Sequence, residues 1–293
     1  MTIFPMDDRI VVITGGNSGI GLETAVGLAA AGARVVLGCR NPDKSAAAVA
    51  DIRARSGNDD VGSRPLDLAD LDSVRGFAES LSDLDRIDVL VNNAGLILDH
   101  RTETAQGFEA TFGINHLGHF LLTRLVDPQL RAAPAARIIC VASLAHAAAV
   151  GGMTWGDLDR HHRFSAWRVY GESKLANILH AQALAHRLEG SGIVAHSLHP
   201  GAVRTNFGGE GDTRGANARF IKLGDPFAIS AEAGARTSIH VASSPDAGST
   251  TGRYWSKCRP ARPAPWAMRA GAPDQLWTTS DRMLAAVDAS TRL

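Results

Sequence analysis

The sequence predicts an α/β fold with a single doubly wound parallel sheet and helices on both of its faces. Short runs rich in Val and Ile recur along the 293 residues without polar alternation, as in "RIVVIT" and "IDVLVN". Such runs are typical of strands buried on both faces. Longer segments with helical spacing separate them, and this alternation of strands and helices builds a parallel sheet that helices cover.

The expected elements follow one another without a break. The strands are expected at residues 9–14, 33–39, 61–66, 87–95, 136–143, 193–201 and 252–256. The helices are expected to about residue 31, to about residue 55, over 71–84, over 107–131, through Tyr170 and over 274–287. No Pro/Gly/Ser-rich linker divides the first 200 residues, so we expect one domain over residues 1–293. Residues 204–227 are rich in Gly and charge and predict a loop, and residues 257–293 predict a C-terminal tail.

The composition excludes several classes of partner and site. Thirty basic residues balance thirty acidic ones, so no net field favours nucleic acid or an anionic membrane, and a small molecule is the expected partner. The three cysteines, Cys39, Cys140 and Cys258, form no CxxC pair, which argues against disulfides and against a metal site. The sequence shows neither a secretory signal nor a run of the ~18 apolar residues that span a bilayer. We therefore expect a cytoplasmic protein without a membrane anchor.

A glycine-rich stretch, "TGGNSGIG", follows the first expected strand and opens the first helix. Its glycines let the backbone turn sharply and approach a pyrophosphate, which then sits at the positive N-terminus of the helix. An ordinary tight turn is the alternative, but the place at the first strand–helix junction favours a dinucleotide. The residues assigned to this phosphate site are Gly15, Asn17, Ser18, Gly19, Ile20 and Gly21.

The end of the second strand indicates which dinucleotide binds. A site that prefers NAD keeps a carboxylate about twenty residues past the glycines, where it bonds the adenosine ribose. Cys39 and Arg40 stand at that place, and a guanidinium suits a 2′-phosphate. Arg40 therefore favours NADP(H) over NAD(H), unless it is only a solvated charge at the strand end.

Two further strand ends add residues to the predicted cofactor site. "LDLAD" places Asp67 to accept from the adenine amino group, with Leu68 beside it. "NNAG" supplies Asn93, Ala94 and Gly95, whose small side chains let a cofactor lie across the strand end. Open α/β sheets bind ligands at the carboxyl ends of their strands. Because a lone Asp at a strand end is more often a helix cap, the prediction depends on the whole set.

Four polar side chains carry the predicted chemistry. Tyr170 and Lys174 lie one helical turn apart in "VYGESKLAN", so they share a helix face. An ammonium close to a phenol favours the phenolate and lowers its pKa towards the range of a general acid or base. Ser143 ends a buried strand, where its hydroxyl can orient a carbonyl and stabilise developing negative charge. Asn115 lies within an apolar helix, where an amide has a hydrogen-bonding role, either catalytic or structural.

Taken in order, these motifs resemble the short-chain dehydrogenases/reductases, which have the Rossmann fold. The resemblance covers about residues 9–205 and rests on TGxxxGxG, NNAG, the helical Asn, the strand-end Ser and YxxxK. It implies a catalytic triad of Ser143, Tyr170 and Lys174, the last two also binding the cofactor, and Asn115 completing a proton relay through water. It further implies that "HPGAVRT" contacts the nicotinamide end of the cofactor through Pro200, Gly201, Val203 and Thr205.

A narrower resemblance is to the retinol-dehydrogenase-type branch of that family. It reaches nearly to the C-terminus and rests on "TGGNSGIGLETA", "CRN", "INHLGHFLLT", "SLAH", "YGESKLANILHAQALAHRL" and "GRYWSKC". The branch implies NADP(H), in agreement with Arg40. Many of its members carry an N-terminal membrane anchor, and this sequence departs from them there, so it looks more like a cytosolic oxidoreductase than a retinoid enzyme.

The predicted function is NADP(H)-dependent hydride transfer between nicotinamide and a carbonyl or alcohol substrate. Residues 144–168 and a substrate loop over 204–227 should flank the nicotinamide. Their large apolar residues favour an apolar substrate, unless they only pack the loops: Met153, Trp155, Phe164, Trp167, Phe207, Phe220 and Phe227.

Other interpretations stay open beside this one. The main alternative is a catalytically silent NADP(H)-binding sensor or scaffold, and an extended nucleotide-sugar epimerase or a methyltransferase fits the motifs less well. The helices with Asn115 and Tyr170 are rich in Ala and Leu on more than one face, so a homo-oligomer also stays open.

Overall fold

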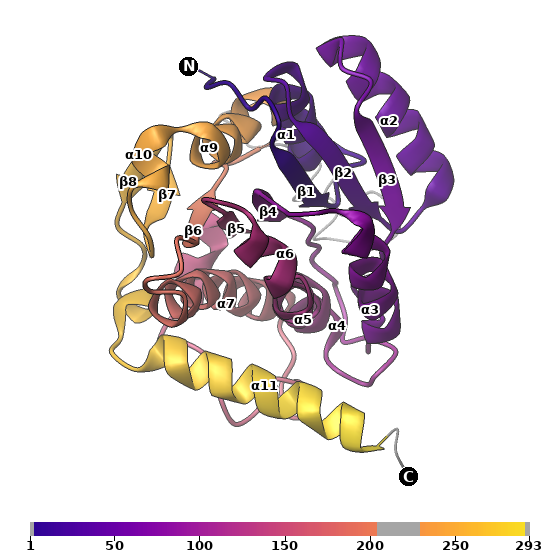
Figure 1. Ribbon diagram of the computed structural model, residues 1–293. Helices are drawn as coiled ribbons and strands as arrows, with labels where there is room; N and C mark the ends of the chain where they lie inside the picture. Colours follow the sequence, from indigo (N-terminus) through magenta and orange to yellow (C-terminus); the bar gives the residue numbers. More distant parts are fainter. Residues whose placement is uncertain (1–2, 204–228, 291–293) are drawn as a thin grey trace.

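Eight strands form one sheet among the residues that the computed structural model describes, which are 3–203 and 229–290 (Figure 1). The strands are β1 (Ile10–Thr14), β2 (Arg34–Cys39), β3 (Val61–Pro65), β4 (Val89–Asn92), β5 (Arg137–Val141), β6 (Val194–His199), β7 (Tyr254–Ser256) and β8 (Arg259–Ala261). Their order is β3-β2-β1-β4-β5-β6-β7-β8, and all neighbours are parallel except β7 and β8. The predicted doubly wound parallel sheet is confirmed, with one antiparallel strand added at its edge.

The strand order reverses between β1 and β4. The chain builds outward from β1 to β3, returns to β4 on the other side of β1, and then builds towards β8. Such a switch point leaves a crevice at the carboxyl ends of the two strands, where open α/β sheets bind ligands. The glycine turn follows β1 at this place, and residues 93–95 follow β4.

Helices cover both faces of the sheet (Figure 1). One face carries α1 (Gly19–Ala30), α2 (Pro42–Ser56), α9 (Ala231–Ser243) and α10 (Pro245–Gly248). The other carries α3 (Leu71–Ser80), α4 (Ala110–Phe112), α5 (Gly118–Leu125), α6 (Asp127–Ala132), α7 (Ala166–Arg187) and α11 (Ala272–Ser290). Shorter elements are the π-helix η2 (Gly113–Leu117) and the 3-10 helices η1 (Leu81–Asp83), η3 (Leu144–Ala148) and η4 (Pro265–Met268).

Each face of the sheet packs into its own apolar core. Along β1, Val11 and Ile13 enter the core under α1 and α9, whereas Val12 enters the core under α5 and α7. Alternate side chains therefore need a buried environment on both sides. This explains why the strands are continuous Val/Ile runs and not alternating ones.

Helix α7 lies in the middle of one face and is buried by the chain itself. It packs against η3, β6 and α11, and its Leu175 and Ile178 are fully buried. Figure 1 shows α11 running alongside α7 on the outside of the molecule. Contacts within the chain thus bury most of α7, and a homo-oligomer stays a prediction.

The structure differs from the sequence expectations in three places. Residues 107–131 form several short elements around the π-helix η2 instead of one helix. Helices α9 and α10 were not expected, because α9 is built mainly from Ala, Gly, Ser and Thr and holds only two large apolar residues, Ile239 and Val241. Strand β8 lies in the proline-rich tail, where proline is tolerated because this is an edge strand.

Candidate active site

The turn after β1 requires glycine where a side chain would collide. Gly15 has a φ of +65°, and a Cβ on it would lie 3.0 Å from Cα of Ala94. A Cβ on Gly21 would overlap the carbonyl oxygen of Gly15. The cradle that glycine leaves here lets the backbone approach a pyrophosphate closely.

Helix α1 begins at Gly19 and has no acidic residue in its first turn. Ser18 precedes it in an extended conformation and makes no side-chain capping bond. The free N–H groups and the helix dipole favour an anion at this end. The glycine turn and the helix start therefore fit the phosphates of a dinucleotide.

Thr14, the last residue of β1, joins this turn to β4. Its hydroxyl oxygen accepts hydrogen bonds from the N–H groups of Asn93 at 2.9 Å and Ala94 at 3.0 Å. The Asn93 side chain donates in return to the Thr14 carbonyl at 2.8 Å. Two of the predicted cofactor residues are thus fixed against β1 at the switch point, and the Asn93 amide is engaged with the protein itself.

The residues predicted for the adenosine end have different surroundings. Arg40 directly follows β2 and is exposed. Asp67 accepts a hydrogen bond from the N–H of Ala69 at 2.9 Å, so it has the local structural role that the sequence left open. Leu68 is buried and packs where Gly118 starts α5. Arg40 is exposed and Asp67 is half-exposed, so both can reach a ligand from solvent, and their binding roles stay predictions.

Ser143, Tyr170 and Lys174 come together beyond the C-terminal end of β5. The Ser143 side chain hydrogen-bonds the Tyr170 phenol from the strand side. The Lys174 ammonium lies 5.7 Å from the centre of the Tyr170 ring and donates to the carbonyl of Val141 at 3.2 Å. Tyr170 and Lys174 are buried, and Ser143 is half-buried. The structure brings the predicted triad into one cluster, and its catalytic role stays a prediction.

The ionisation of this pair differs from the sequence expectation. Burial raises the pKa of Tyr170 to about 12, and the hydrogen bond with Ser143 acts in the opposite direction without cancelling it. Burial lowers the pKa of Lys174 to about 8, with Cys140 acting in the opposite direction. The expectation of a lowered Tyr170 pKa is wrong for this structure, because burial dominates the net shift. The Lys174 ammonium donates to the Val141 carbonyl.

Asn115 lies in η2, and both ends of its amide are engaged. Its Nδ2 donates to the carbonyl of Leu96 and to the hydroxyl of Ser173, each at 2.9 Å. Its Oδ1 accepts from the N–H of Leu96 at 2.8 Å. The side chain therefore positions the backbone that follows β4 and ties it to α7. A relay through water stays a prediction.

Gly95 brings that same backbone close to two predicted catalytic side chains. A Cβ at this position would lie 2.8 Å from Nζ of Lys174 and 3.1 Å from Oδ1 of Asn115. The chain after β4 passes here without a side chain of its own. This predicted cofactor residue thus lies beside the predicted catalytic residues.

The residues predicted for the nicotinamide end follow β6. Pro200 and Gly201 are half-buried, and the Gly201 N–H donates to Nδ1 of His199 at 3.0 Å. Val203 pairs with Ile229 in an isolated bridge. Thr205, Phe207, Phe220, Phe227 and the expected substrate loop over 204–227 lie outside the described residues.

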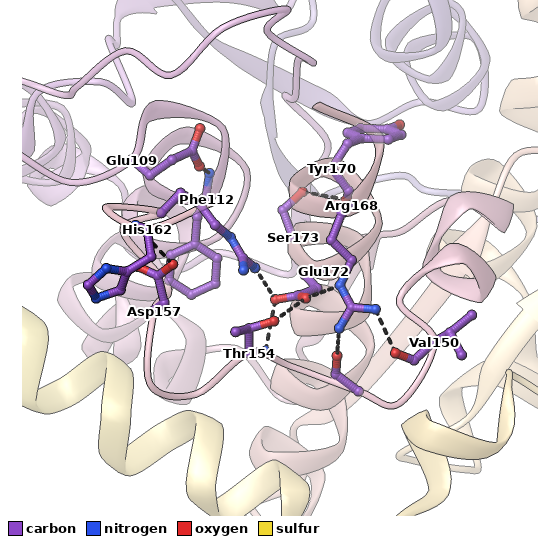
Figure 2. A network of polar contacts seen from close by, with 12 residues as sticks. Glu109, Phe112, Val150, Thr154, Asp157, His162, Arg168, Tyr170, Glu172 and Ser173 are labelled. Atoms are coloured by element: carbon purple, nitrogen blue, oxygen red, sulfur yellow. Dashed lines mark hydrogen bonds and ion pairs between the residues drawn. The ribbon is translucent and has the colours of Figure 1, made fainter. Parts of the chain in front are cut away.

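The segment between Ser143 and α7 is anchored by a buried carboxylate, Glu172. Figure 2 shows Arg168 and Thr154 directed at Glu172, while Tyr170 projects from α7 in another direction. The Thr154 N–H and hydroxyl donate to Glu172 at 3.0 and 2.8 Å, and Arg160 is its second cationic partner. This network fixes residues 150–160 to the helix that carries Tyr170.

The large apolar side chains of residues 144–168 divide into packing and exposed groups. Met153 is buried, and Trp155 is partly buried against the core of the same face. Phe164 packs on the small cluster that includes Tyr170. Trp167 is 41% exposed, and its ring centre lies 6.3 Å from that of Tyr170. Trp167 is therefore the aromatic residue of this segment that is placed to meet a substrate.

Several residues with clear roles in this site were missed from the sequence. Thr14, His119 and Glu172 organise it through hydrogen bonds, and His146 contacts the main chain of Ser143. Only their positions in the sequence could have identified them, because Thr14 precedes the glycine turn and Glu172 lies between Tyr170 and Lys174. Their partners come from distant parts of the chain, so no local pattern reveals them.

Residues 3–203 and 229–290 contain no group of three His, Cys, Asp or Glu side chains that could hold a metal ion. None of the helices in these ranges is both long and apolar enough to cross a bilayer.

Comparisons with known proteins agree with this geometry. A family model for short chain dehydrogenases matches residues 9–156. Retinol dehydrogenase 12 of Mus musculus is 39% identical over 94% of this chain and 86% of its own length, and human retinol dehydrogenase 13 is 38% identical over 97% and 87%.

Solved structures give the same result. The crystal structure of an uncharacterized protein from Mycobacterium paratuberculosis has 34% identity and a TM-score of 0.77, over 96% of this chain and 95% of that one. The Pseudomonas aeruginosa RhlG/NADP active-site complex has 27% identity and a TM-score of 0.65, over 86% and 95%. The chain therefore belongs to the short-chain dehydrogenase/reductase family and is an oxidoreductase of the kind that binds a nicotinamide cofactor.

Proposed function

We propose that this enzyme transfers a hydride between NADP(H) and the carbonyl or alcohol carbon of a small apolar substrate. The observation that carries the proposal is the cluster of Ser143, Tyr170 and Lys174 at the edge of the sheet where the glycine turn lies. Gly95 connects the two parts, because its backbone lies against Lys174. Hydride transfer requires this proximity of a proton donor and a bound nicotinamide.

The preference for NADP(H) over NAD(H) rests on Arg40. This exposed guanidinium follows β2, where a site for NAD keeps a carboxylate. A guanidinium can bind a 2′-phosphate through paired charge-assisted hydrogen bonds. The NADP complex among the similar structures supports the same choice.

In the reducing direction, the Ser143 hydroxyl orients the substrate carbonyl and stabilises the charge that develops on its oxygen. With a pKa raised to about 12, Tyr170 keeps its proton at neutral pH and can donate it to that oxygen, since an alkoxide is a far stronger base than a phenolate. Lys174 holds a cationic charge beside the phenolate that remains. A bound nicotinamide supplies the hydride in this direction and accepts it in the other.

The apolar nature of the substrate rests on side chains around Ser143 and Tyr170. Leu144, next to Ser143, is 51% exposed, and the exposed Trp167 lies against Tyr170. Exposed apolar groups beside a reacting centre suit an apolar substrate. Similarity to retinol dehydrogenases supports this class of substrate without fixing the compound.

The proposal is tested by following NADPH consumption, by absorbance, across a panel of apolar aldehydes and ketones. NADH is run in parallel, together with an Arg40→Asp variant. We expect turnover with NADPH, and we expect Arg40→Asp to raise the KM for NADPH by about tenfold or more while affecting NADH little. Fluorescence titration that shows tight NADPH binding without turnover of any carbonyl or alcohol would favour the silent sensor. Equal use of NADH and NADPH by the wild type would contradict the role of Arg40.

A further inference from the structure

We propose that His146 is a positioning residue of this reaction, which holds Ser143 in place and ties it to the C-terminal segment at Ala264. The proposal rests on the proposed catalytic role of Ser143. His146 is three residues past Ser143, in η3, and is only 4% exposed.

Both ring nitrogens of His146 are engaged. Nδ1 lies 2.6 Å from the main-chain carbonyl oxygen of Ser143, and Nε2 lies 3.0 Å from the main-chain nitrogen of Ala264. A carbonyl can only accept and an N–H can only donate, so Nδ1 carries the proton and Nε2 offers its lone pair. The neutral ring thus uses its whole hydrogen-bonding capacity in linking these two segments.

Three other contacts hold His146 itself. The indole N–H of Trp266 donates to its main-chain carbonyl at 2.8 Å, and the ring packs edge-on against Tyr254 at 5.3 Å. Its N–H also donates to the Ser143 carbonyl at 3.1 Å. Residues 264–266 and β7, both far along the chain, therefore brace η3.

These bonds fix the direction of the Ser143 hydroxyl. The Ser143 carbonyl is held by both the ring and the N–H of His146, which sets the peptide that follows it. The Ser143 hydroxyl accepts from the N–H of Ala145 at 3.1 Å while it meets the Tyr170 phenol. If the Ser143 carbonyl were not held, the peptide could rotate, and the Ser143 hydroxyl would no longer point at the reacting oxygen of the substrate. Small displacements of this kind cost large factors in rate.

The environment of His146 suits the neutral ring that this role needs. Burial lowers its pKa, and the bond to the Ser143 main chain acts in the opposite direction. His199, on β6, is stacked on Tyr254, and burial lowers its pKa as well, to about 4. The two histidine rings that contact Tyr254 are therefore neutral. This agrees with Nε2 of His146 acting as the hydrogen-bond acceptor for the N–H of Ala264.

Two substitutions at His146 and one at Ala264 separate positioning from packing. His146→Phe keeps a ring against Tyr254 but removes both hydrogen bonds. His146→Asn can restore the donor to Ser143, because its Nδ2 stands as many bonds from Cα as Nδ1 of histidine. Ala264→Pro removes only the N–H that donates to Nε2 of His146. Ala264 has a φ of −58°, which proline adopts without strain.

A matched control is available in His196, a second buried histidine bonded at both nitrogens. It contacts the carbonyl of Ala247 and the indole of Trp255, in the core on the opposite face of the sheet. His196→Phe should lower the melting temperature by a similar amount. Because it lies away from Ser143, it should leave kcat unchanged.

The test compares kcat, the Kd for NADPH and hydrogen exchange of residues 143–149 in these variants. We expect His146→Phe to lower kcat by about tenfold or more with little change in the Kd for NADPH, and His146→Asn to recover most of the loss. We expect Ala264→Pro to lower kcat partly and to speed exchange of residues 143–149.

Three results would overturn the proposal: an unchanged kcat in His146→Phe, equal losses in His146→Phe and His146→Asn, or unchanged exchange at residues 143–149 in His146→Phe and Ala264→Pro. Failure of the proposed function has a different signature, which is a Tyr170→Phe variant with the wild-type rate. In that case the exchange measurement still decides whether His146 holds Ser143.

Discussion

The hydroxyl of Thr14 and Nε2 of His119 lie 2.8 Å apart, and this contact joins the glycine turn to α5, which directly follows the π-helix that carries Asn115. Thr14 already accepts from the N–H groups of Asn93 and Ala94, so its own proton goes to the nearer acceptor, Nε2 of His119, and not to the Val91 carbonyl at 3.4 Å. The other ring nitrogen, Nδ1, is then protonated and donates to the Asn115 carbonyl at 3.1 Å. The predicted cofactor site and the predicted catalytic helix are thus coupled through one buried neutral histidine.

Thr14→Val should weaken both stability and cofactor binding. Valine keeps the shape but leaves the N–H groups of Asn93 and Ala94 without an acceptor, which costs about 1–3 kcal/mol for each buried donor that stays unpaired. Thermal unfolding and an NADPH titration measure the two effects. Thr14→Ser keeps the hydroxyl and is the control, and equal behaviour of the two variants would contradict the role of this hydroxyl.

Gly95→Ala should reduce turnover more than stability. The new methyl group would meet Nζ of Lys174 and Oδ1 of Asn115, so one or both must shift from the positions seen here. We expect kcat to fall by about tenfold or more, measured under saturating NADPH. Gly76→Ala is the matched control, since a Cβ there has open space and should stabilise α3 by about 0.5–1 kcal/mol. A kcat of Gly95→Ala near that of the control would show that the close approach does not matter.

Glu172→Gln should destabilise the enzyme strongly. Glu172 and Arg160 are both buried, so loss of the negative charge leaves a buried guanidinium without its counter-ion, which typically costs about 3–5 kcal/mol. The matched control is Asp281→Asn, which removes a half-exposed partner of Arg124 and should cost less than about 1 kcal/mol. Denaturant unfolding gives both values. Similar values for the two variants would mean that the network of Figure 2 does not anchor residues 150–160.

Stability should fall as the pH drops from about 6.5 to about 4. Burial lowers the pKa values of His119 and His199 to about 4 and that of His180 to about 3. In this window the unfolded chain binds protons that the folded chain excludes, so the stabilisation is complete above pH 6.5 and is lost below it. By pH 4, each of these histidines lowers the free energy of unfolding by on the order of 3 kcal/mol relative to its value above pH 6.5. Melting temperatures measured across this range should decline more gently for His180→Phe than for the wild type, and identical slopes would contradict the assignment.

The sequence was sufficient for the fold class and for the neighbourhood of the site, for physical reasons. Strands buried on both faces must be continuous apolar runs, and a close backbone approach must be glycine, so β1 and Gly15 are visible locally. Helix α9 was missed because most of its residues are small and only Ile239 and Val241 are large and apolar. The raised pKa of Tyr170 could not be predicted from the sequence, because it depends on burial, and this burial arises from packing of α7 against distant segments.

The same reasoning separates the polar residues that were found from those that were missed. Ser143 and Tyr170 are recognisable by their place at a strand end and on a helix. His146 acquires its role from Ala264, more than a hundred residues away, and Thr14 from His119. Hydrogen bonds between distant segments leave no pattern in the sequence of either one.

Single-turnover reduction of an apolar aldehyde by Tyr170→Phe loaded with NADPH decides whether Tyr170 is the proton donor. Phenylalanine keeps the ring against Trp167 and removes only the proton donor. We expect NADPH to bind with nearly the wild-type affinity and the rate of its oxidation to fall by at least about a hundredfold. A variant that oxidises NADPH at the wild-type rate would show that Tyr170 is not the acid of this reaction.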